Sequence, residues 1–448
     1  MMSMDRTSGD RGVPAQATED GVDLVSRSLP LADVSFGALL DVTDDVCVQW
    51  ATPDGLEIVG CRGSKTIDAS GPDRFEQIRT AAMAEFSTIE HEGPRVARPR
   101  AFGGFAFHDG HVQSELWEGF DAASFVIPQA IVTRSESETW LTGVGSSTTE
   151  VDLVLEEWTE RIERLPAMQS SGTRPGVAST RRTTTPEEWA EGVEIALDRI
   201  DRGELRKVVL AQALAATLEG PAKVPATLER LRRCYPDCYR FSIDPNRGGT
   251  FFGAPPERLI ATRGNALETE ALAGSVPRGS TPEEDDELVE RMCKSDKFDR
   301  EHALVVEAIR ERLVSLTNGL EVGERTVRKL ATIQHLQTPI EGTLVEDRHV
   351  LELVEALHPT PAVGGLPTDT AWETIRAVES FDRGWYAAPV GWFDVDGDGE
   401  FAVGIRSGLA RDETVTLFAG NGIVADSDPD EEWEEVQLKF RPILDELG

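Results

Sequence analysis

Residues 205–218, LRKVVLAQALAATL, form a run in which apolar side chains fall on both faces of an extended chain. With a period of two, Lys207, Val209 and Ala211 share one face, and Val208 and Leu210 share the other. A strand that is apolar on both faces is covered on both faces, so this segment predicts a buried strand. A chain of 448 residues can supply the covering layers as two compact units or as one large domain with two layers of sheet.

Composition divides the chain into four segments. Residues 1–20 are polar and are expected to be disordered. Residues 21–168 contain short strand patterns with turns and are expected to form a β-rich N-terminal part. Residues 169–185 are rich in Ser, Thr, Gly and Pro, as in a linker-like connection. Residues 186–448 carry the densest motifs, so we expect the functional region there.

Three local patterns predict further elements. Residues 102–117, FGGFAFHDGHVQSELW, have apolar positions with a period of two around an Asp-Gly turn, which predicts a β-hairpin. Residues 151–165 have apolar positions at helical spacing. Thr185, which precedes a proline and two glutamates, predicts the start of another helix.

The formal net charge of -35 disfavours whole classes of partner. Phosphate-rich surfaces repel such a chain at long range, so we expect neither nucleic acid nor an anionic membrane as a partner. Only seven of the 45 basic residues are lysines, and this acidic, lysine-poor composition is typical of proteins that stay hydrated in high salt. We therefore expect a halophilic protein, in which a small anionic substrate needs a metal ion or a few placed basic side chains.

Cysteine usage and the N-terminus indicate the compartment. Five cysteines without CxxC spacing predict neither a disulfide framework nor a zinc ribbon. No stretch approaches the ~20 apolar residues of a membrane span, and the polar N-terminus lacks the apolar core of a signal peptide. We expect a cytoplasmic protein with no membrane partner.

Lys207 and Glu257 are the candidate acid–base pair. A lysine that enters a buried strand of a lysine-poor chain is either a strand-end side chain whose ammonium reaches solvent or a general base. Glu257 follows two prolines in GAPPERL, which fix the backbone and so the direction of its carboxyl group. The alternative for Glu257 is a solvent-facing turn residue paired with Arg258.

Glu301, Glu432 and Glu435 are the candidate metal ligands. In residues 430–440, DEEWEEVQLKF, apolar side chains recur at helical spacing and place Glu432, Glu435 and Lys439 at the edge of the buried face. Glu301 lies near the start of a second helix. Carboxylates from two helix edges suit Mg²⁺, which prefers oxygen ligands and keeps several waters. The alternative is a glutamate–lysine pair, four residues apart, on a solvated helix.

Three glycine-rich stretches, ALAGSVPRG, PAVGGLP and AGNGIV, are predicted to be turns whose backbone N–H groups can face anions. None has the pattern of a phosphate-binding loop or of a dinucleotide fold. A nucleotide site is therefore not expected.

Eight motifs follow one another in a characteristic order: RKVVLAQ, GAPPERL, ALAGSVPRG, KFDREHALVVE, IQHLQTPIEG, LHPTPAVGGLP, DRGWYAAPVGW and AGNGIVADSDPDEEWEEVQLK. In this order they resemble the chorismate-utilising enzymes, most closely the isochorismate synthases. The resemblance implies that residues 186–448 are a chorismate-binding catalytic region. It also implies an α+β fold in which two large antiparallel sheets pack together and are flanked by helices.

The resemblance further implies an isomerase that adds water at C2 of chorismate and removes the C4 hydroxyl, with Mg²⁺ as cofactor. Lys207 is implied to be the base that activates water, and Glu257 the acid that protonates the leaving hydroxyl. The implied metal ligands are Glu301, Glu432 and Glu435. The implied substrate-binding residues are Gly274, Ser275, His335, Ala362, Tyr386, Arg406, Gly420, Gly422 and Lys439.

Ala362 bears on which reaction follows chorismate binding, because its rigid Pro-Gly loop resembles the family's wall beside the substrate ring. The ammonia-using relatives carry a Gly-Thr pair in this loop, and salicylate synthases carry a threonine. A methyl group cannot hydrogen-bond the ring substituents, so we expect isochorismate as the product. A respiratory quinone is the expected need of a salt-loving prokaryote, so we expect the product to serve menaquinone synthesis. Nothing in the chain resembles a glutaminase, and no glutaminase subunit is expected. The alternatives are a salicylate synthase, which goes on to eliminate pyruvate, and a non-catalytic chorismate-binding protein.

Several positions depart from the family's pattern. Phe298 stands where an acidic residue is usual, one helical turn before Glu301. Four other positions carry Gln, Ser, Ala and Asn in place of the usual Arg, Thr, Gly and Ala: Gln212, Ser275, Ala388 and Asn421.

Overall fold

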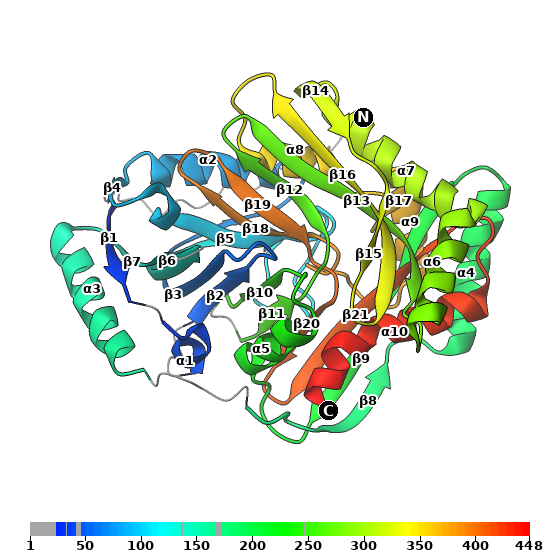
Figure 1. The fold of residues 1–448 in the computed structure, drawn as a ribbon, viewed down its shortest axis with the longest axis horizontal. Coiled ribbons are helices and arrows are strands. Elements are labelled where there is room, and N and C mark those ends of the chain that lie inside the picture. Colours follow the sequence, from blue (N-terminus) through cyan, green and yellow to red (C-terminus); the bar gives the residue numbers. More distant parts are fainter. Residues whose placement is uncertain (1–23, 33, 42–45, 136–137, 166–171, 246–247) are drawn as a thin grey trace, which may run out of the picture.

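The computed structural model describes residues 24–32, 34–41, 46–135, 138–165, 172–245 and 248–448 (Figure 1). The expected disorder of residues 1–20 falls outside this range. The described strands form one hydrogen-bonded network, in which the pairing of β1 with β4 is parallel and the other pairings are antiparallel.

The strand β6 (Ala123–Ser135) joins two limbs of this network. One of its edges pairs with β3. Its other edge pairs first with β5, at residues 123–126, and then with β7, at residues 130–135. The first limb runs from β3 (Glu57–Ala69) through β2 (Val46–Ala51), β10 (Arg240–Ile243), β11 (Thr250–Gly253), β20 (Ser407–Arg411), β21 (Thr414–Ile423) and β9 (Lys207–Leu218) to β8 (Val177–Arg182). The second limb runs from β5 (Arg100–Phe105) through β18 (Pro389–Asp394), β19 (Gly399–Val403), β12 (Arg258–Arg263) and β13 (Ala266–Pro277) to β16 (Ile333–Leu344).

Short strands extend the network at its edges. Along the second limb, β16 also pairs with β14 (Thr317–Val322) and β15 (Thr326–Lys329). The strand β7 (Glu138–Gly145) pairs with β1 (Val25–Leu31), which pairs with β4 (Glu90–Glu92). The two-residue β17 (Gly365–Leu366) pairs with the start of β9.

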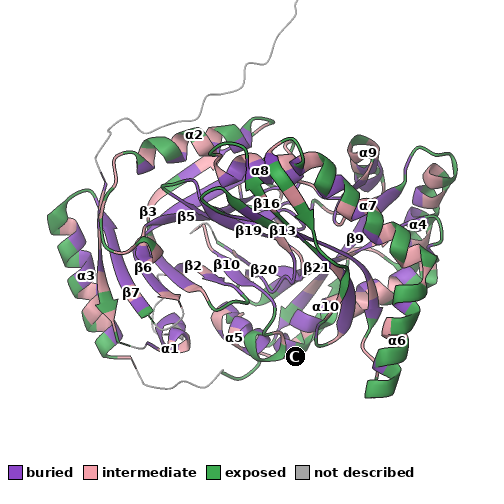
Figure 2. Ribbon diagram, turned by 45° about the horizontal axis from the view of Figure 1, so that its top comes forward, coloured by how far each residue is buried: buried purple, intermediate pink, exposed green. Residues whose placement is uncertain are grey.

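Helices cover the outside of the strands, and Figure 2 shows their exposed residues facing away from the buried strands. Among them, α7 packs on β13, and α10 packs on β21 and β9. The helices are α1 (Phe36–Asp41), α2 (Arg74–Phe86), α3 (Thr148–Glu163), α4 (Pro186–Asp201), α5 (Val224–Cys234), α6 (Pro282–Lys294), α7 (Asp296–Leu313), α8 (Val350–Leu357), α9 (Thr368–Val378) and α10 (Pro429–Leu447), with a 3₁₀ turn at Arg95–Ala97. No helix in the described part of the chain has the length and apolar character that crossing a membrane requires.

One large hydrophobic core contains side chains from both limbs. Phe251 of β11 contacts Trp385, which precedes β18, with ring centroids 6.2 Å apart. Trp117 stacks on Phe418 of β21 at 5.4 Å. The two limbs therefore pack against each other, which confirms the expected α+β fold with two large antiparallel sheets flanked by helices. The two sheets are continuous with each other through β6.

Several local expectations are confirmed. The strand β9 begins at Lys207 and is buried from there to Leu214. Thr185 and Glu188 form a capping box at the start of α4, and the helix expected over residues 151–165 is α3. The segment 169–185, expected to be a linker-like connection, contains the strand β8, whose residues pair with β9. This expectation is therefore not among the confirmed ones.

The hairpin expected over residues 102–117 is wrong. After β5 ends at Phe105, residues 106–122 contain no strand, and β5 pairs with β18 and β6 instead. The apolar residues after the Asp-Gly turn do not form a strand. Trp117, the last of them, is fully buried and stacks on Phe418 of the core.

Two glycine-rich stretches expected to be turns are strands. The first five residues of AGNGIV lie within β21, where Gly420 and Gly422 pair with Ala211 and Val209 of β9. In ALAGSVPRG, Gly274 has a φ of 78° and forms a β-bulge within β13. Glycine permits the positive φ of the bulge and a close approach to the paired strand, so these residues do not mark chain reversals.

Candidate active site

A cavity lies where the two limbs meet α7 and α10. It contains about 900 Å³ of space free of protein atoms, its open mouth included. Every candidate residue named from the sequence lines this cavity: Lys207, Glu257, Gly274, Ser275, Glu301, His335, Ala362, Tyr386, Arg406, Gly420, Gly422, Glu432, Glu435 and Lys439.

Lys207 enters the cavity from the first residue of β9, and its side chain is only 1% exposed. Its ammonium therefore does not reach bulk solvent, which removes the first alternative for this residue. The paired strand supplies the room that the lysine needs. A Cβ atom at Gly422 would lie 2.7 Å from Cε of Lys207 and 2.9 Å from Oε1 of Glu301, so a larger residue would push these two side chains apart.

Three lysine–glutamate pairs line the cavity. Nζ of Lys207 lies 3.0 Å from Oε1 of Glu301, and Nζ of Lys297 lies 3.2 Å from Oε1 of Glu432. The third pair joins Lys439 and Glu435 at 2.8 Å. This third pair has the spacing expected for a surface helix, yet both side chains line the cavity.

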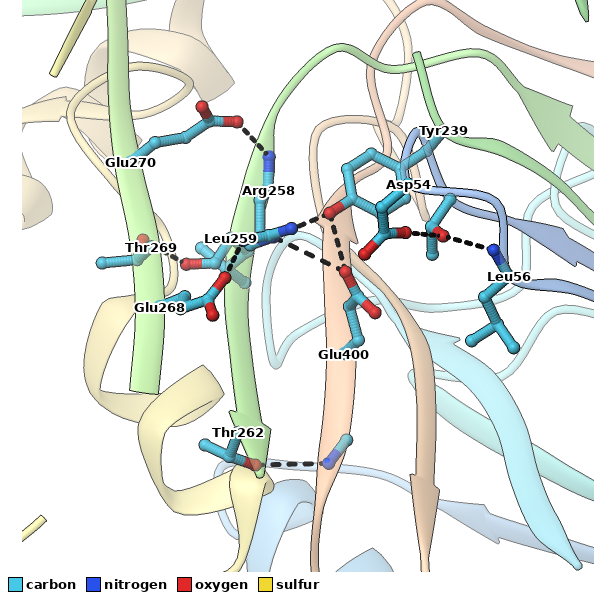
Figure 3. A network of polar contacts seen from close by, with 12 residues as sticks. Asp54, Leu56, Tyr239, Arg258, Leu259, Thr262, Glu268, Thr269, Glu270 and Glu400 are labelled. Carbon is cyan, nitrogen blue, oxygen red and sulfur yellow. Dashed lines mark hydrogen bonds and ion pairs between the residues drawn. The ribbon is translucent and has the colours of Figure 1, made fainter. Parts of the chain in front are cut away.

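Glu257 lies between β11 and β12 and is 4% exposed. The alternative pairing with Arg258 does not occur, because that guanidinium binds Glu268 and Tyr239 and lies 3.5 Å from Glu400 (Figure 3). Burial, and next the charge of Glu270, raise the pKa of the Glu257 carboxyl to about 8, against the opposing charge of Lys207. The carboxyl group is therefore neutral near pH 7.

The cavity lining also includes basic and hydroxyl groups. Arg406 is buried and has a φ of 49°, and the neighbouring Ala387 has a φ of 61°. Such φ values are costly for residues other than glycine and gather at functional sites. Tyr386 is buried beside this arginine in the cavity wall, and Oγ of Ser275 donates to Glu435 at 2.7 Å.

His335 of β16 is a neutral ring in the cavity wall. Burial, followed by the positive charges of Arg406 and Lys439, holds its pKa well below the usual value. Its Nε2 atom is buried and has no hydrogen-bond partner among the residues that the structure describes. A buried nitrogen without a partner is costly, so this atom is available to a ligand or a water.

The Pro-Gly loop forms one wall of the cavity through Ala362 and Val363. Arg383, which sequence reasoning missed, fixes this wall to β9, because it donates to Val363 O at 2.8 Å and to Val209 O at 2.7 Å. His358 ends α8 and its Nε2 lies 2.9 Å from Phe107 O, outside the cavity lining.

Lys297 is the second residue that sequence reasoning missed. It precedes Glu301 by one helical turn on α7, and this spacing was the available signal. Burial opposes its charge, but Glu432, Glu301 and Glu435 together raise its pKa. All three candidate metal ligands therefore act on one ammonium group.

The chemistry of the three carboxylates suits Mg²⁺, because all of them are oxygen donors. Together they already surround one positive charge, the ammonium group of Lys297. In the described part of the chain no group of three or more Asp, Glu, His or Cys side chains is arranged to hold a metal ion by itself. Mg²⁺ usually keeps waters and needs only one or two carboxylates, so the set suits a hydrated ion. Phe298 lines the cavity beside Gly274 and supplies no further ligand.

Comparisons with known proteins show the family to which the chain belongs. The family described as chorismate binding enzyme matches residues 15–448. Isochorismate synthase MenF of Bacillus subtilis is 36% identical over 411 residues, which cover 89% of this chain and 87% of that protein. The salicylate biosynthesis isochorismate synthase of Pseudomonas aeruginosa is 35% identical over 446 residues, 97% of this chain and 92% of that protein.

A solved structure is similar over almost the whole chain. It is that of MenF, the menaquinone-specific isochorismate synthase from Escherichia coli, with a TM-score of 0.79 and 27% identity. The similarity covers 98% of this chain and 96% of the other.

Proposed function

Because the chain belongs to the family of chorismate-binding enzymes, we propose that it is an isochorismate synthase, an isomerase that moves a hydroxyl group around the ring of chorismate. The observation that carries this proposal is that Lys207, at the start of β9 in the first limb, and Glu257, directly before β12 of the second limb, line one cavity. An amine and a neutral carboxyl group on two sides of a ring can act together as base and acid.

In the proposed reaction Lys207 takes a proton from a water molecule, whose oxygen attacks C2 of the ring. The double bonds shift, and Glu257 gives its proton to the C4 hydroxyl as that group leaves. Glu257 holds a proton near neutral pH, as this role requires. Lys207 must first release the proton that its ammonium directs at Glu301.

Chorismate carries two carboxylates, and the cavity has the groups to hold them. Arg406, Tyr386 and Lys439 would bind them together with Ser275 and the N–H groups of Gly274, Gly420 and Gly422. His335 would donate to or accept from the ring substituents through its unpaired Nε2. Charge-assisted bonds of this kind orient a small anion strongly.

We propose Mg²⁺ as the cofactor, held by Glu301, Glu432 and Glu435 with waters. When bound, it supplies positive charge to a substrate carboxylate inside an acidic protein. Glu301, which pairs with Lys207, would be one of the residues that hold the ion, so Lys207 would then lose this partner.

Ala362 favours isochorismate as the final product, because its methyl group cannot hydrogen-bond the ring or assist pyruvate elimination. We propose that the product serves menaquinone synthesis, in keeping with the similarity to MenF proteins. We also propose a cytoplasmic, salt-adapted enzyme without a glutaminase subunit. The second candidate is a salicylate synthase, and the third is a non-catalytic chorismate-binding protein.

Product analysis tests this proposal. Chorismate is incubated with the enzyme in molar KCl, with and without Mg²⁺, and the products are separated by chromatography. Isochorismate in equilibrium with chorismate, formed only with Mg²⁺, is the expected result. Salicylate with pyruvate would replace the proposal by the second candidate, and metal-dependent chorismate binding without turnover would replace it by the third.

A further inference from the structure

Glu270 is a buried glutamate on β13 that lies outside the cavity lining. Its side chain is 10% exposed, and Arg328 of β15 donates to its two oxygens at 3.2 and 3.4 Å. Gln337 also donates to it. A further bond comes from the main chain, because the N–H of Arg258 donates to Oε1 of Glu270 at 3.0 Å. Glu270 thus binds the residue directly after Glu257.

This bond replaces a missing part of the sheet. Backbone pairing between β12 and β13 extends from Arg263 and Ala266 to Ala261 and Glu268. Beyond that point two side chains of β13 take over, since the hydroxyl of Thr269 donates to Leu259 O at 2.6 Å and Glu270 accepts from Arg258 (Figure 3). Side chains of β13 therefore fix the beginning of β12, where the backbone ladder has ended.

The Glu257 carboxyl group depends on this backbone for its direction. The hydrogen bonds around Glu257 in the described structure are made by its main chain, and Val403 N donates to Glu257 O at 3.2 Å. The next peptide N–H is the one that Glu270 holds. The carbonyl of Glu257 and the N–H of Arg258 belong to one peptide unit, the one that follows Glu257. Fixing this peptide limits the directions that the Glu257 side chain can take.

Glu270 also acts on Glu257 through its charge. Burial is the first cause of the raised pKa of Glu257, and Glu270 is the second, while Lys207 and Arg328 oppose it. The other titratable groups facing the cavity are the three lysine–glutamate pairs, His335 of β16, Tyr386 and Arg406. Arg328 forms an ion pair with Glu270, with 3.2 Å between the two groups.

We propose that Glu270 is a positioning residue for the acid of the reaction, which orients the Glu257 carboxyl through the Arg258 N–H and places a negative charge behind it. The inference rests on the proposed function in assigning the acid role to Glu257. The hydrogen bond and the charge make separable contributions, because a glutamine at this position keeps an acceptor oxygen and loses the charge.

The test compares Glu270→Gln with Glu270→Ala in the pH dependence of kcat/KM. For Glu270→Gln we expect the fall of kcat/KM at alkaline pH to begin about one pH unit lower than in the wild type. The kcat/KM value on the plateau below that pH should stay within a few fold of the wild-type value. For Glu270→Ala we expect the same shift and, in addition, a plateau at least ~10-fold lower. Glu268→Gln is the matched control, because Glu268 lies on the same strand and binds Arg258, yet its side chain is 58% exposed. Glu268→Gln should leave the alkaline fall of kcat/KM at the wild-type pH.

A second readout needs no turnover. Infrared spectroscopy of the free enzyme follows the carboxyl C=O band that Glu257→Gln abolishes, and its titration midpoint should be lower in Glu270→Gln than in the wild type. The same midpoint in Glu270→Gln, Glu268→Gln and the wild type overturns the proposal. A shifted midpoint in an enzyme that makes no isochorismate overturns the proposed function and leaves the link between the two carboxyl groups intact.

If Glu270→Gln does not fold, Arg328→Met is a second variant for the same infrared measurement. Because Arg328 opposes the raised pKa of Glu257, its removal should move the infrared midpoint to higher pH. A midpoint that stays in place or moves down contradicts the proposal.

Discussion

Nζ of Lys207 lies 3.0 Å from Oε1 of Glu301, inside a cavity where the lysine side chain is 1% exposed. The candidate base, Lys207, is therefore paired with Glu301, one of the candidate metal ligands. Two further lysines repeat this arrangement with Glu432 and Glu435. A divalent cation held by these carboxylates would therefore compete with the three lysines for them.

Lys207→Ala should lower turnover by at least ~100-fold, because general base catalysis typically contributes this much. The initial rate of isochorismate formation, followed by chromatography, measures the effect. Lys223→Ala, at an exposed lysine before α5, is the control and should retain wild-type activity. A Lys207→Ala enzyme with more than about a tenth of the wild-type turnover would remove the base assignment.

Glu257 predicts how activity and stability depend on pH. Its pKa of about 8 means that kcat/KM should fall as the pH rises through 8, because the acid loses its proton. The pKa is raised in the fold, so the unfolded chain ionises first as the pH rises. Glu257 therefore destabilises the fold increasingly from about pH 4.5, its ordinary value, to about pH 8.

The measurement for this prediction is thermal unfolding of Glu257→Gln and the wild type at pH 5 and pH 8. The variant should gain stability relative to the wild type at pH 8, by at most about 4 kcal/mol, and much less at pH 5. An equal difference at both pH values would show that the fold does not hold Glu257 neutral.

Lys297→Met should bind Mg²⁺ more tightly than the wild type. The Lys297 ammonium is surrounded by Glu432, Glu301 and Glu435, and it competes with a metal ion for these carboxylates. We expect the Kd for Mg²⁺, measured by calorimetry without substrate, to fall roughly tenfold, or by about 1.4 kcal/mol.

Lys294→Met is the control for the metal prediction, because Lys294 is 72% exposed and pairs with Glu290 just before α7. Its Kd should equal that of the wild type. Weaker or unchanged binding by Lys297→Met would mean that this lysine does not occupy the place of the ion.

Gly422→Ala should reduce kcat by about a hundredfold with little change in Tm. Its Cβ atom would lie 2.7 Å from Cε of Lys207, which must move, and misplacement of a catalytic group by about 1 Å has an effect of this size. Gly37→Ala is the control, because no atom lies within 4 Å of its added Cβ. Normal kcat in Gly422→Ala would show that the position of Lys207 is not critical.

The sequence predicted those features of the fold that are determined by residues close together in the chain. Lys207 begins a buried strand, and Thr185 caps a helix, because periodicity and capping are properties of short segments. The hairpin at residues 102–117 failed because the partner of β5 is β18, far along the chain. Gly420 and Gly422 suggested a turn, whereas their strand pairs with β9.

The candidate residues from the family's motifs all line one cavity, but their partners were hidden in the sequence. Glu270 and Arg383 act through main-chain groups of distant segments, and no local pattern marks such bonds. Lys297 lies within a recognised motif, yet its position among three carboxylates depends on the ion pair that it makes with Glu432 of α10.

Isotope labelling tests the central claim most directly. The enzyme is mixed with chorismate and Mg²⁺ in molar KCl made with ¹⁸O-water, and the first product formed is examined by mass spectrometry. Water addition at C2 predicts isochorismate with one ¹⁸O atom in its C2 hydroxyl. Unlabelled isochorismate, or salicylate and pyruvate in its place, would contradict the account.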